Sequence, residues 1–277
     1  MAGKKKDTSL LHHLVGSRSL VWNLAKNDIK KKFAGSYFGV VWAFVQPVIT
    51  VLLYWFVFEK GLNSKATDLR TGIEIPFVLW LTAGLVPWFY FQEALNGGTG
   101  VLVEYSYLVK KVVFQIDMLP VVKMISALFT HLFFVAFTIV LFICMGYMPD
   151  WYALQVVYYS FCMILFATGL VYATSAVTVF FRDMKEVVGI LLQIGMWVTP
   201  IMWNFETMVQ IPGWAITVLK LNPMYYIVSG YRNALINHIG FWEDMGLTVY
   251  FWVVTAVILF LGTTVFKKLR PHFADVS

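Results

Sequence analysis

Apolar runs long enough to cross a lipid bilayer recur along this chain. A transmembrane helix needs about 20 apolar residues to cross a hydrocarbon core about 30 Å thick, and such runs recur from Tyr37 to Phe266. Of the 277 residues, 60% are hydrophobic and 13% are charged, whereas a soluble domain is about 45–50% apolar and about 25% charged. We therefore expect an all-α membrane protein.

The pattern predicts six transmembrane helices within a single domain, residues 1–277. No linker or internal repeat divides the chain. The predicted spans cover residues 37–58, 76–94, 119–147, 151–181, 187–203 and 247–266.

Lysine and arginine are distributed unevenly between the connections. With the N-terminus inside, the inner segments hold Lys4–Lys6, Arg18, Lys26, Lys30–Lys32, Lys110, Lys111, Arg182, Lys185, Lys267, Lys268 and Arg270, with Lys123 near a boundary. The outer segments hold Lys60, Lys65, Arg70, Lys220 and Arg232. This bias follows the positive-inside rule and predicts that both termini are cytoplasmic. The net charge of 21 − 15 = +6 is then explained by topology, and no nucleic-acid partner is predicted. We expect no cleaved signal peptide, because the lysine-bearing start lacks an apolar segment followed by a cleavage site.

An amphipathic helix is predicted at about residues 17–34, before the first span. Apolar residues, among them Trp22, recur there at helical spacing, and the lysines lie mostly on other faces. Such a helix lies in the inner headgroup layer, where Lys26, Lys30, Lys31 and Lys32 would meet anionic lipid. The lysines either fix topology alone or also bind a lipid phosphate.

Two connections are too long to be simple turns. The first, at about 96–118, contains Val101, Tyr105 and Leu108 at the spacing of a short amphipathic helix. The second, residues 204–246, contains two short apolar segments separated by Asn222-Pro223, which breaks a helix. Because neither segment is long enough to cross, we expect a pair of short re-entrant helices on the outer face.

Two other classes of membrane protein fit the sequence less well. An enzyme needs a nucleophile, paired carboxylates or a metal cluster, but the spans offer Glu93 at one end and a lone His131, which is typical of a packing residue. Cys144 and Cys162 form no CxxC pair, so no metal site or disulfide is predicted. An ion-coupled transporter needs ionisable residues in mid-membrane, which the spans lack. The chain also lacks a P-loop, so the energy for active transport would come from a separate ATPase that grips the connection at 96–118.

Aromatic residues are concentrated in two stretches. One contains Trp88, Phe89 and Tyr90, and the other contains Pro223, Tyr225, Tyr226 and Arg232. Trp and Tyr gather at bilayer interfaces regardless of function. Alternatively, these rings line a pathway for sugars, which pack their C–H faces on aromatic rings. Arg232 would then meet an anionic group or pair with a local acid.

Several stretches resemble the permease subunits of ABC-2 type exporters of cell-surface polysaccharides. The resemblance runs nearly end to end and includes LAKNDIKKKFAGSYFGVVWAFVQPV, YWFVF, AGLVPWFYF, LVKKVVF, FRDMKEV, TPIMW and LKLNPMYYIVSGYRNALI. Each motif is weak alone, but their shared order and spacing are specific. Within this group, YWFVF, GLVPWFYF and LNPMYYIVSGYR most resemble permeases that translocate wall teichoic acid. Glu59-Lys60, after YWFVF, departs from the more apolar pattern of that group.

The resemblance implies a transport subunit in the bacterial cytoplasmic membrane. It implies a homodimer that works with two cytoplasmic ATPase subunits, which bind ATP and magnesium, while this chain itself holds no cofactor. The cargo would be a polymer linked to undecaprenyl pyrophosphate, with teichoic acid first and O antigen, capsule, or a small lipid or drug as alternatives. The implied ATPase contacts are Val101, Glu104, Tyr105, Leu108, Lys110, Lys111, Arg182 and Asp183. The amphipathic helix would lie near the entry of the polymer, and residues 212–236 would form an outer gate.

Overall fold

A computed structural model defines the fold of the chain. It describes residues 18–32, 34–109, 116–204 and 212–273. This part of the chain is almost entirely helical, which confirms the all-α fold class. A small antiparallel hairpin is the exception: β1 (Ala66–Thr67) pairs with β2 (Glu74–Ile75) at one end of the molecule.

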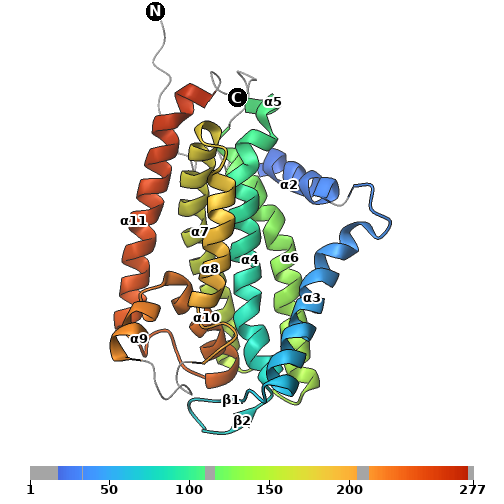
Figure 1. Cartoon of the computed structure of the whole chain (residues 1–277), viewed down its shortest axis with the longest axis vertical. Coiled ribbons are helices and arrows are strands. Elements are labelled where there is room, and N and C mark those ends of the chain that lie inside the picture. The colour runs from blue at the N-terminus through green and yellow to red at the C-terminus, as the bar shows by residue number, and fades with distance from the viewer. Residues whose placement is uncertain (1–17, 33, 110–115, 205–211, 274–277) are drawn as a thin grey trace, which may run out of the picture.

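Four long helices form the centre of the bundle (Figure 1). In the middle lies α4 (Phe77–Glu104), which packs against α6 (Met118–Cys144) and α7 (Gln155–Phe180). The fourth, α11 (Met245–Leu269), packs along α7. Most residues of α4 are buried, so this helix is the core around which the others are arranged.

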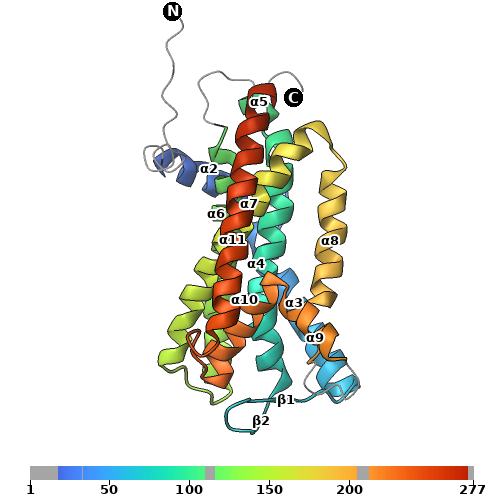
Figure 2. The same ribbon diagram turned by 90° about the vertical axis from the view of Figure 1, so that its left-hand side faces the viewer.

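Two further long segments lie at the edge of the bundle. One is α3 (Trp42–Trp55), which leans away from the others, and Val51 is its buried residue. The other is α8 (Met184–Val198), in which Val188 and Leu192 are buried. Figure 2 shows α8 on one flank of the bundle and α2 (Arg18–Lys32) on the opposite flank.

Short helical segments complete the fold. The four-residue α5 (Ser106–Val109) follows α4, and α9 (Gly213–Lys220) and α10 (Pro223–Arg232) lie at the end of the bundle near the hairpin. Single 3-10 or π-helical turns lie at Gly39–Val41, Phe56–Gly61, Trp151–Leu154, Asn233–Asn237 and Arg270–His272.

Four helical segments within the described ranges are long and apolar enough to cross a membrane. They are Gly39–Gly61, Met118–Cys144, Trp151–Phe180 and Met245–His272, which correspond to the first, third, fourth and sixth predicted spans. The second predicted span lies in α4, whose mean hydropathy is lowered by small and polar residues. The fifth lies in α8, whose 15 residues extend only about 22 Å. The count of six spans therefore stays a prediction.

The predicted connection at about 96–118 begins within a helix. Here α4 continues to Glu104, although Gly and Asn are poor helix formers. Tertiary packing explains the difference. Gly98 has no room for a side chain, since a Cβ there would clash with Val171 of α7. Beside it, the hydroxyls of Thr99 and Thr174 are 2.8 Å apart, so α4 and α7 pack closely through this stretch.

The helix predicted at about residues 17–34 is present as α2. It was expected to lie in the lipid headgroup layer, but part of its apolar face packs on protein. Val21 and Ala25 pack against Met118 and Val122 of α6, so part of the face meets protein. The short helices expected between 204 and 246 are present as α9 and α10. Asn222 separates them, and its side chain caps α10 by accepting a hydrogen bond from the Met224 N–H at 3.0 Å.

Candidate functional site

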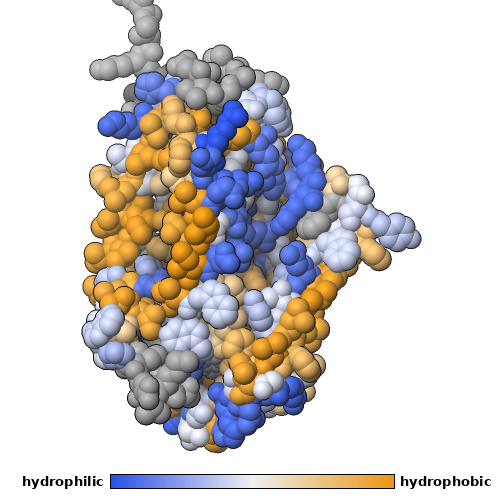
Figure 3. Space-filling view, viewed as in Figure 1, coloured by the Kyte–Doolittle hydropathy of each residue, from blue (hydrophilic) through white to orange (hydrophobic). Residues whose placement is uncertain are grey.

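A cavity of about 760 Å³ opens between α2, α3, α4, α6 and α8. It lies toward the end of the bundle that carries α2 and α5, opposite the hairpin. Figure 3 shows hydrophilic residues gathered here between the apolar surfaces of α3 and α8. We call it the basic-end cavity.

Charged side chains of both signs line the basic-end cavity. They are Lys31, Lys32, Lys123, Lys185, Asp28, Glu93 and Glu104. Four positive and three negative groups sum to +1. Lys32 Nζ lies 2.6 Å from Glu93 Oε1, and Lys123 Nζ lies 2.6 Å from Asp28 Oδ1 and 2.8 Å from Glu104 Oε2. These pairs account for all three carboxylates.

Two lysines of the cavity lie outside these pairs. Within the described residues, neither Lys31 nor Lys185 makes an ion pair. The Lys31 ammonium lies 5.3 Å from the centroid of the Tyr105 ring, and Lys185 lies along α4 beside Gly100. Because both side chains are exposed and the net charge of the lining side chains is +1, they make the cavity attractive to an anion.

The rest of the cavity wall combines hydrogen-bonding and aromatic groups. Gln46 and Thr50 come from α3, Gln92 and Asn96 from α4, and Thr130 from α6. The aromatic members are Trp42, Tyr54 and Phe89. Amides and hydroxyls beside aromatic faces can bind sugars, and lysines can bind phosphate. The cavity wall can therefore bind both a sugar and a phosphate group.

The cavity brings together only part of the predicted lysine cluster. Lys31 and Lys32 line it, whereas Trp22, Lys26 and Lys30 do not. The Lys26 ammonium lies 5.3 Å from the Trp22 ring centroid. That ring in turn lies 5.1 Å from the ring of Phe129, on another face of α2.

The residues expected to contact an ATPase lie at the same end of the molecule. Val101 and Tyr105 are buried, while Glu104, Arg182 and Asp183 are exposed. Leu108 belongs to α5, although its side chain is not among those described, and Lys110 and Lys111 lie outside the described residues. Because Lys185 packs beside Gly100, the link between α7 and α8 lies next to the C-terminal part of α4.

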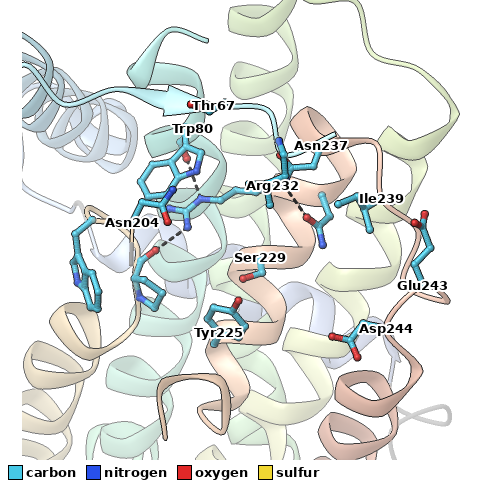
Figure 4. A pocket seen from close by; sticks show the side chains of 14 residues that line it. Thr67, Trp80, Asn204, Tyr225, Ser229, Arg232, Asn237, Ile239, Glu243 and Asp244 are labelled. Atoms are coloured by element: carbon cyan, nitrogen blue, oxygen red, sulfur yellow. Dashed lines mark hydrogen bonds between the residues drawn. The ribbon is translucent and has the colours of Figure 1, made fainter. Parts of the chain in front are cut away.

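A smaller pocket of about 260 Å³ lies at the opposite end, between α4, α10 and the hairpin. Figure 4 shows Trp80, Tyr225 and Arg232 on its wall. Its two carboxylates have structural roles: Glu243 accepts the Gly240 N–H at 2.7 Å, and Asp244 caps α11 by accepting the Leu247 N–H at 3.0 Å. We call it the hairpin-end pocket.

Arg232, which was expected to meet an anionic group or pair with a local acid, is buried and bonds to backbone carbonyls. Its Nη1 and Nη2 donate to the carbonyls of Pro200 and Ile201, each at 2.7 Å. Its guanidinium lies 3.3 Å from the centroid of the Trp80 ring. Arg232 therefore ties α10 to α4 and to the segment after α8.

The other aromatic residues expected along a pathway are mostly inside the bundle. Trp88 and Tyr90 are buried, whereas Phe89 lines the basic-end cavity. Pro223 is half-buried at the start of α10. Tyr226 is buried, and its hydroxyl lies 3.0 Å from the Tyr158 hydroxyl and 3.1 Å from Thr248 Oγ1.

Sequence reasoning missed several members of the basic-end cavity. Lys123 and Lys185 were counted only toward topology, and Asp28 was not singled out. One signal was available for Lys123 and Glu93, because ionisable residues within apolar stretches mark functional sites or buried pairs. No three His, Cys, Asp or Glu residues come close enough in the described ranges to hold a metal ion.

Comparison with known proteins assigns the family. The family model described as "ABC-2 type transporter" matches residues 19–236. The chain is 25% identical over 266 residues to the O-antigen export system permease protein RfbA of Myxococcus xanthus, covering 96% of this chain and 98% of the relative. It is 21% identical over 257 residues to the protein of the same name from Klebsiella pneumoniae, covering 91% and 93%. The chain belongs to the ABC-2 type transporter family and is a membrane transport subunit rather than an enzyme.

Proposed function

We propose that this chain is the permease subunit of an ATP-driven exporter of a lipid-linked cell-surface polysaccharide. The observation that carries the proposal is the basic-end cavity, which combines a net positive charge and two lysines outside its ion pairs with amides and aromatic rings. A lipid-linked polysaccharide carries a diphosphate beside its first sugars, so it matches both parts of this wall. The names of the relatives, which are O-antigen export permeases, support the same class of cargo.

The proposal places the basic end in the cytoplasm. Lys31 and Lys32 end α2, Lys185 lies in the first turn of α8 and Lys267 in the last turn of α11, and these parts of the helices lie at that end (Figure 1). Lys65 directly precedes β1 of the hairpin at the other end. This distribution favours cytoplasmic termini and six spans under the positive-inside rule. The diphosphate would then enter the basic-end cavity from the inner leaflet, and α9 and α10 would lie at the outer exit.

O antigen is the favoured cargo, attached to undecaprenyl pyrophosphate. The relatives support O antigen, whereas the motifs at YWFVF and GLVPWFYF favour wall teichoic acid. Both cargoes present the same lipid diphosphate to the cavity, but the teichoic acid polymer also carries phosphate in its repeats. The two therefore differ in the charge of the polymer that follows the first sugars.

The power for export would come from another subunit. The sequence has no GxxxxGK[ST] motif, and that motif cradles the phosphates of ATP in such ATPases. We propose a homodimer of this chain with two ATPase subunits that bind ATP and magnesium, in a bacterial cytoplasmic membrane. The end of α4, α5 and the α7–α8 link form the surface for docking.

Copurification tests this proposal. We would purify the tagged full chain from its native membrane and identify bound proteins and lipids by mass spectrometry. The ATPase activity of the purified complex would then be measured with lipid-linked O-antigen oligosaccharide, teichoic acid precursor, or undecaprenyl phosphate alone. We expect an ATPase to copurify and O-antigen oligosaccharide to stimulate it most. No associated ATPase, or no response to any glycan-bearing lipid, would overturn the proposal.

A further inference from the structure

A lysine on α6 is held between carboxylates from two other parts of the chain. Lys123 Nζ lies 2.6 Å from Asp28 Oδ1 on α2 and 2.8 Å from Glu104 Oε2 at the end of α4. The Lys123 and Asp28 side chains are 13% and 7% exposed, whereas Glu104 is 51% exposed. A buried pair such as Lys123 and Asp28 is held firmly, because separating the charges leaves each one desolvated and unpaired.

Tyr105 makes a second connection to the same carboxylate. Its hydroxyl donates to Asp28 Oδ1 at 2.8 Å, and its ring lies below the ammonium groups of Lys123 and Lys31, at 5.6 and 5.3 Å. Burial and the hydrogen bond to Asp28 raise the pKa of Tyr105 above its ordinary value. The phenol therefore stays protonated and keeps donating.

This cluster lies where α4 ends and α5 begins. The helix breaks at Tyr105, whose φ and ψ are −103° and 31°, and α5 starts at the next residue. On the other side, α2 is fixed to α6 by packing and by the Ser126 hydroxyl, which donates to the Ala25 carbonyl at 3.1 Å. The cluster of Lys123, Asp28, Glu104 and Tyr105 thus joins α2, α6 and the α4–α5 junction.

We propose that Lys123 is a positioning residue that makes α2 and the α4–α5 junction move together. Since α2 carries Lys31 and Lys32 of the basic-end cavity, a displacement of α5 is passed directly to the cavity wall. The inference rests on the proposed function, in which α5 contacts an ATPase and the cavity receives the cargo. Lys123 would then link nucleotide binding at one surface to the shape of the cargo site.

Variants of the full chain in the reconstituted ATPase complex test this link. Lys123→Met removes the charge, and Lys123→Arg keeps it. Glu104→Ala removes only the exposed ion pair with Lys123 and keeps the buried pair between Lys123 and Asp28. An effect of this variant is therefore not explained by loss of the buried pair and misfolding. Lys267→Met, at an exposed lysine on α11, is the matched control. We expect Lys123→Met and Glu104→Ala to lower stimulation by lipid-linked oligosaccharide about fivefold, the lower end of a coupling between sites. Lys123→Arg should recover most of the stimulation, because it keeps the charge.

A distance measurement separates coupling from mere stabilisation. Spin labels would replace the exposed Asn23 of α2 and Tyr107 of α5, with Cys144 and Cys162 changed to Ala and labelled chains diluted with unlabelled ones. We expect one narrow distance with and without ATP, and a broadened, nucleotide-dependent distribution in Glu104→Ala. An unchanged distribution in Glu104→Ala, or equal stimulation in Lys123→Met and Lys267→Met, would overturn the inference. If oligosaccharide fails to stimulate even the parent complex, the proposed function fails, and the spin-label distances still test the link.

Discussion

Arg232 stacks on Trp80, with its guanidinium carbon 3.3 Å from the centroid of the indole ring. The same guanidinium donates to the Pro200 and Ile201 carbonyls. One side chain thus joins α4, α10 and the segment after α8. The pair lies on the wall of the hairpin-end pocket (Figure 4), and its contacts suit a structural role.

Arg232→Lys should destabilise the protein, although it keeps the charge. Lysine lacks the planar fork that reaches two carbonyls at once, so at least one charged hydrogen bond is lost, worth about 2 kcal/mol. Thermal unfolding in detergent would measure the change. Lys65→Met is the control, because Lys65 forms an exposed pair with Glu74 and such pairs contribute at most about 1 kcal/mol. Equal unfolding temperatures for the two variants would contradict the role assigned to Arg232.

Gly262→Ala should separate α7 from α11. A Cβ at Gly262 would clash with the backbone carbonyl oxygen of Gly169, and backbone cannot move aside as a side chain does. Overpacking of this kind costs about 1–3 kcal/mol. Gly189→Ala in α8 is the matched control, because a Cβ there meets nothing within 4 Å and alanine is the better helix former by about 1 kcal/mol. The unfolding temperature in detergent should be lower for Gly262→Ala than for the parent, and for Gly189→Ala it should equal or exceed the parent value. The reverse order would contradict the close packing of α11 on α7 at Gly262.

Features of the fold were predictable from the sequence where neighbouring residues determine them, and not where residues distant in the sequence do. The lysine-rich helix and the Asn222-Pro223 break were predictable, because amphipathic spacing and helix breakers act within a few residues. The continuation of α4 through Gly97 and Gly98 was not, because its cause is close packing on α7. The partners of Arg232 were not predictable for the same reason: they lie about 30 and 150 residues away in the sequence.

Asp68 should make the hairpin sensitive to acid. Burial alone would raise the pKa of Asp68, but hydrogen bonds from the Thr71 hydroxyl at 2.6 Å and the Arg70 N–H at 2.8 Å outweigh it, and the pKa lies below the ordinary value of 3.8. A carboxylate with a lowered pKa contributes stability above pH 3.8, and the contribution is lost as the pH falls through the folded-state pKa. Hydrogen exchange at residues 66–75, corrected for the intrinsic rate, should therefore rise in acid. Asp68→Asn should flatten this pH dependence of hydrogen exchange. An unchanged pH dependence in Asp68→Asn would contradict the role assigned to Asp68.

Lys31→Gln and Lys185→Gln should each weaken the response to a lipid diphosphate. A lysine near such a group contributes about 1 kcal/mol, so the half-saturating concentration of oligosaccharide should rise about fivefold per variant. Because the attraction is electrostatic, the effect should shrink at high salt. Lys26→Gln is the control, since Lys26 lies over Trp22 outside the cavity. A response to Lys26→Gln equal to the other two would mean that general surface charge, rather than the cavity, attracts the cargo.

The cavity itself was predictable only in part. Lys31 and Lys32 belonged to a visible cluster of charge, and both line it. Lys123 and Lys185 come from α6 and α8, which reach the same cavity as α2 only in the folded chain. Residues this far apart in the sequence give no sign that they line one cavity. Among the described residues Lys185 makes no ion pair, which becomes evident only once the ion pairs of Lys32 and Lys123 are known.

Directional transport tests the central claim most directly. Proteoliposomes would hold the full chain and its ATPase, with fluorescent lipid-linked oligosaccharide on the ATP-accessible side and a glycan-cleaving enzyme sealed in the lumen. We expect luminal cleavage that needs ATP, needs both subunits and falls in Lys31→Gln. Cleavage at the same rate without the ATPase, or none in an intact complex that hydrolyses ATP, would contradict the account.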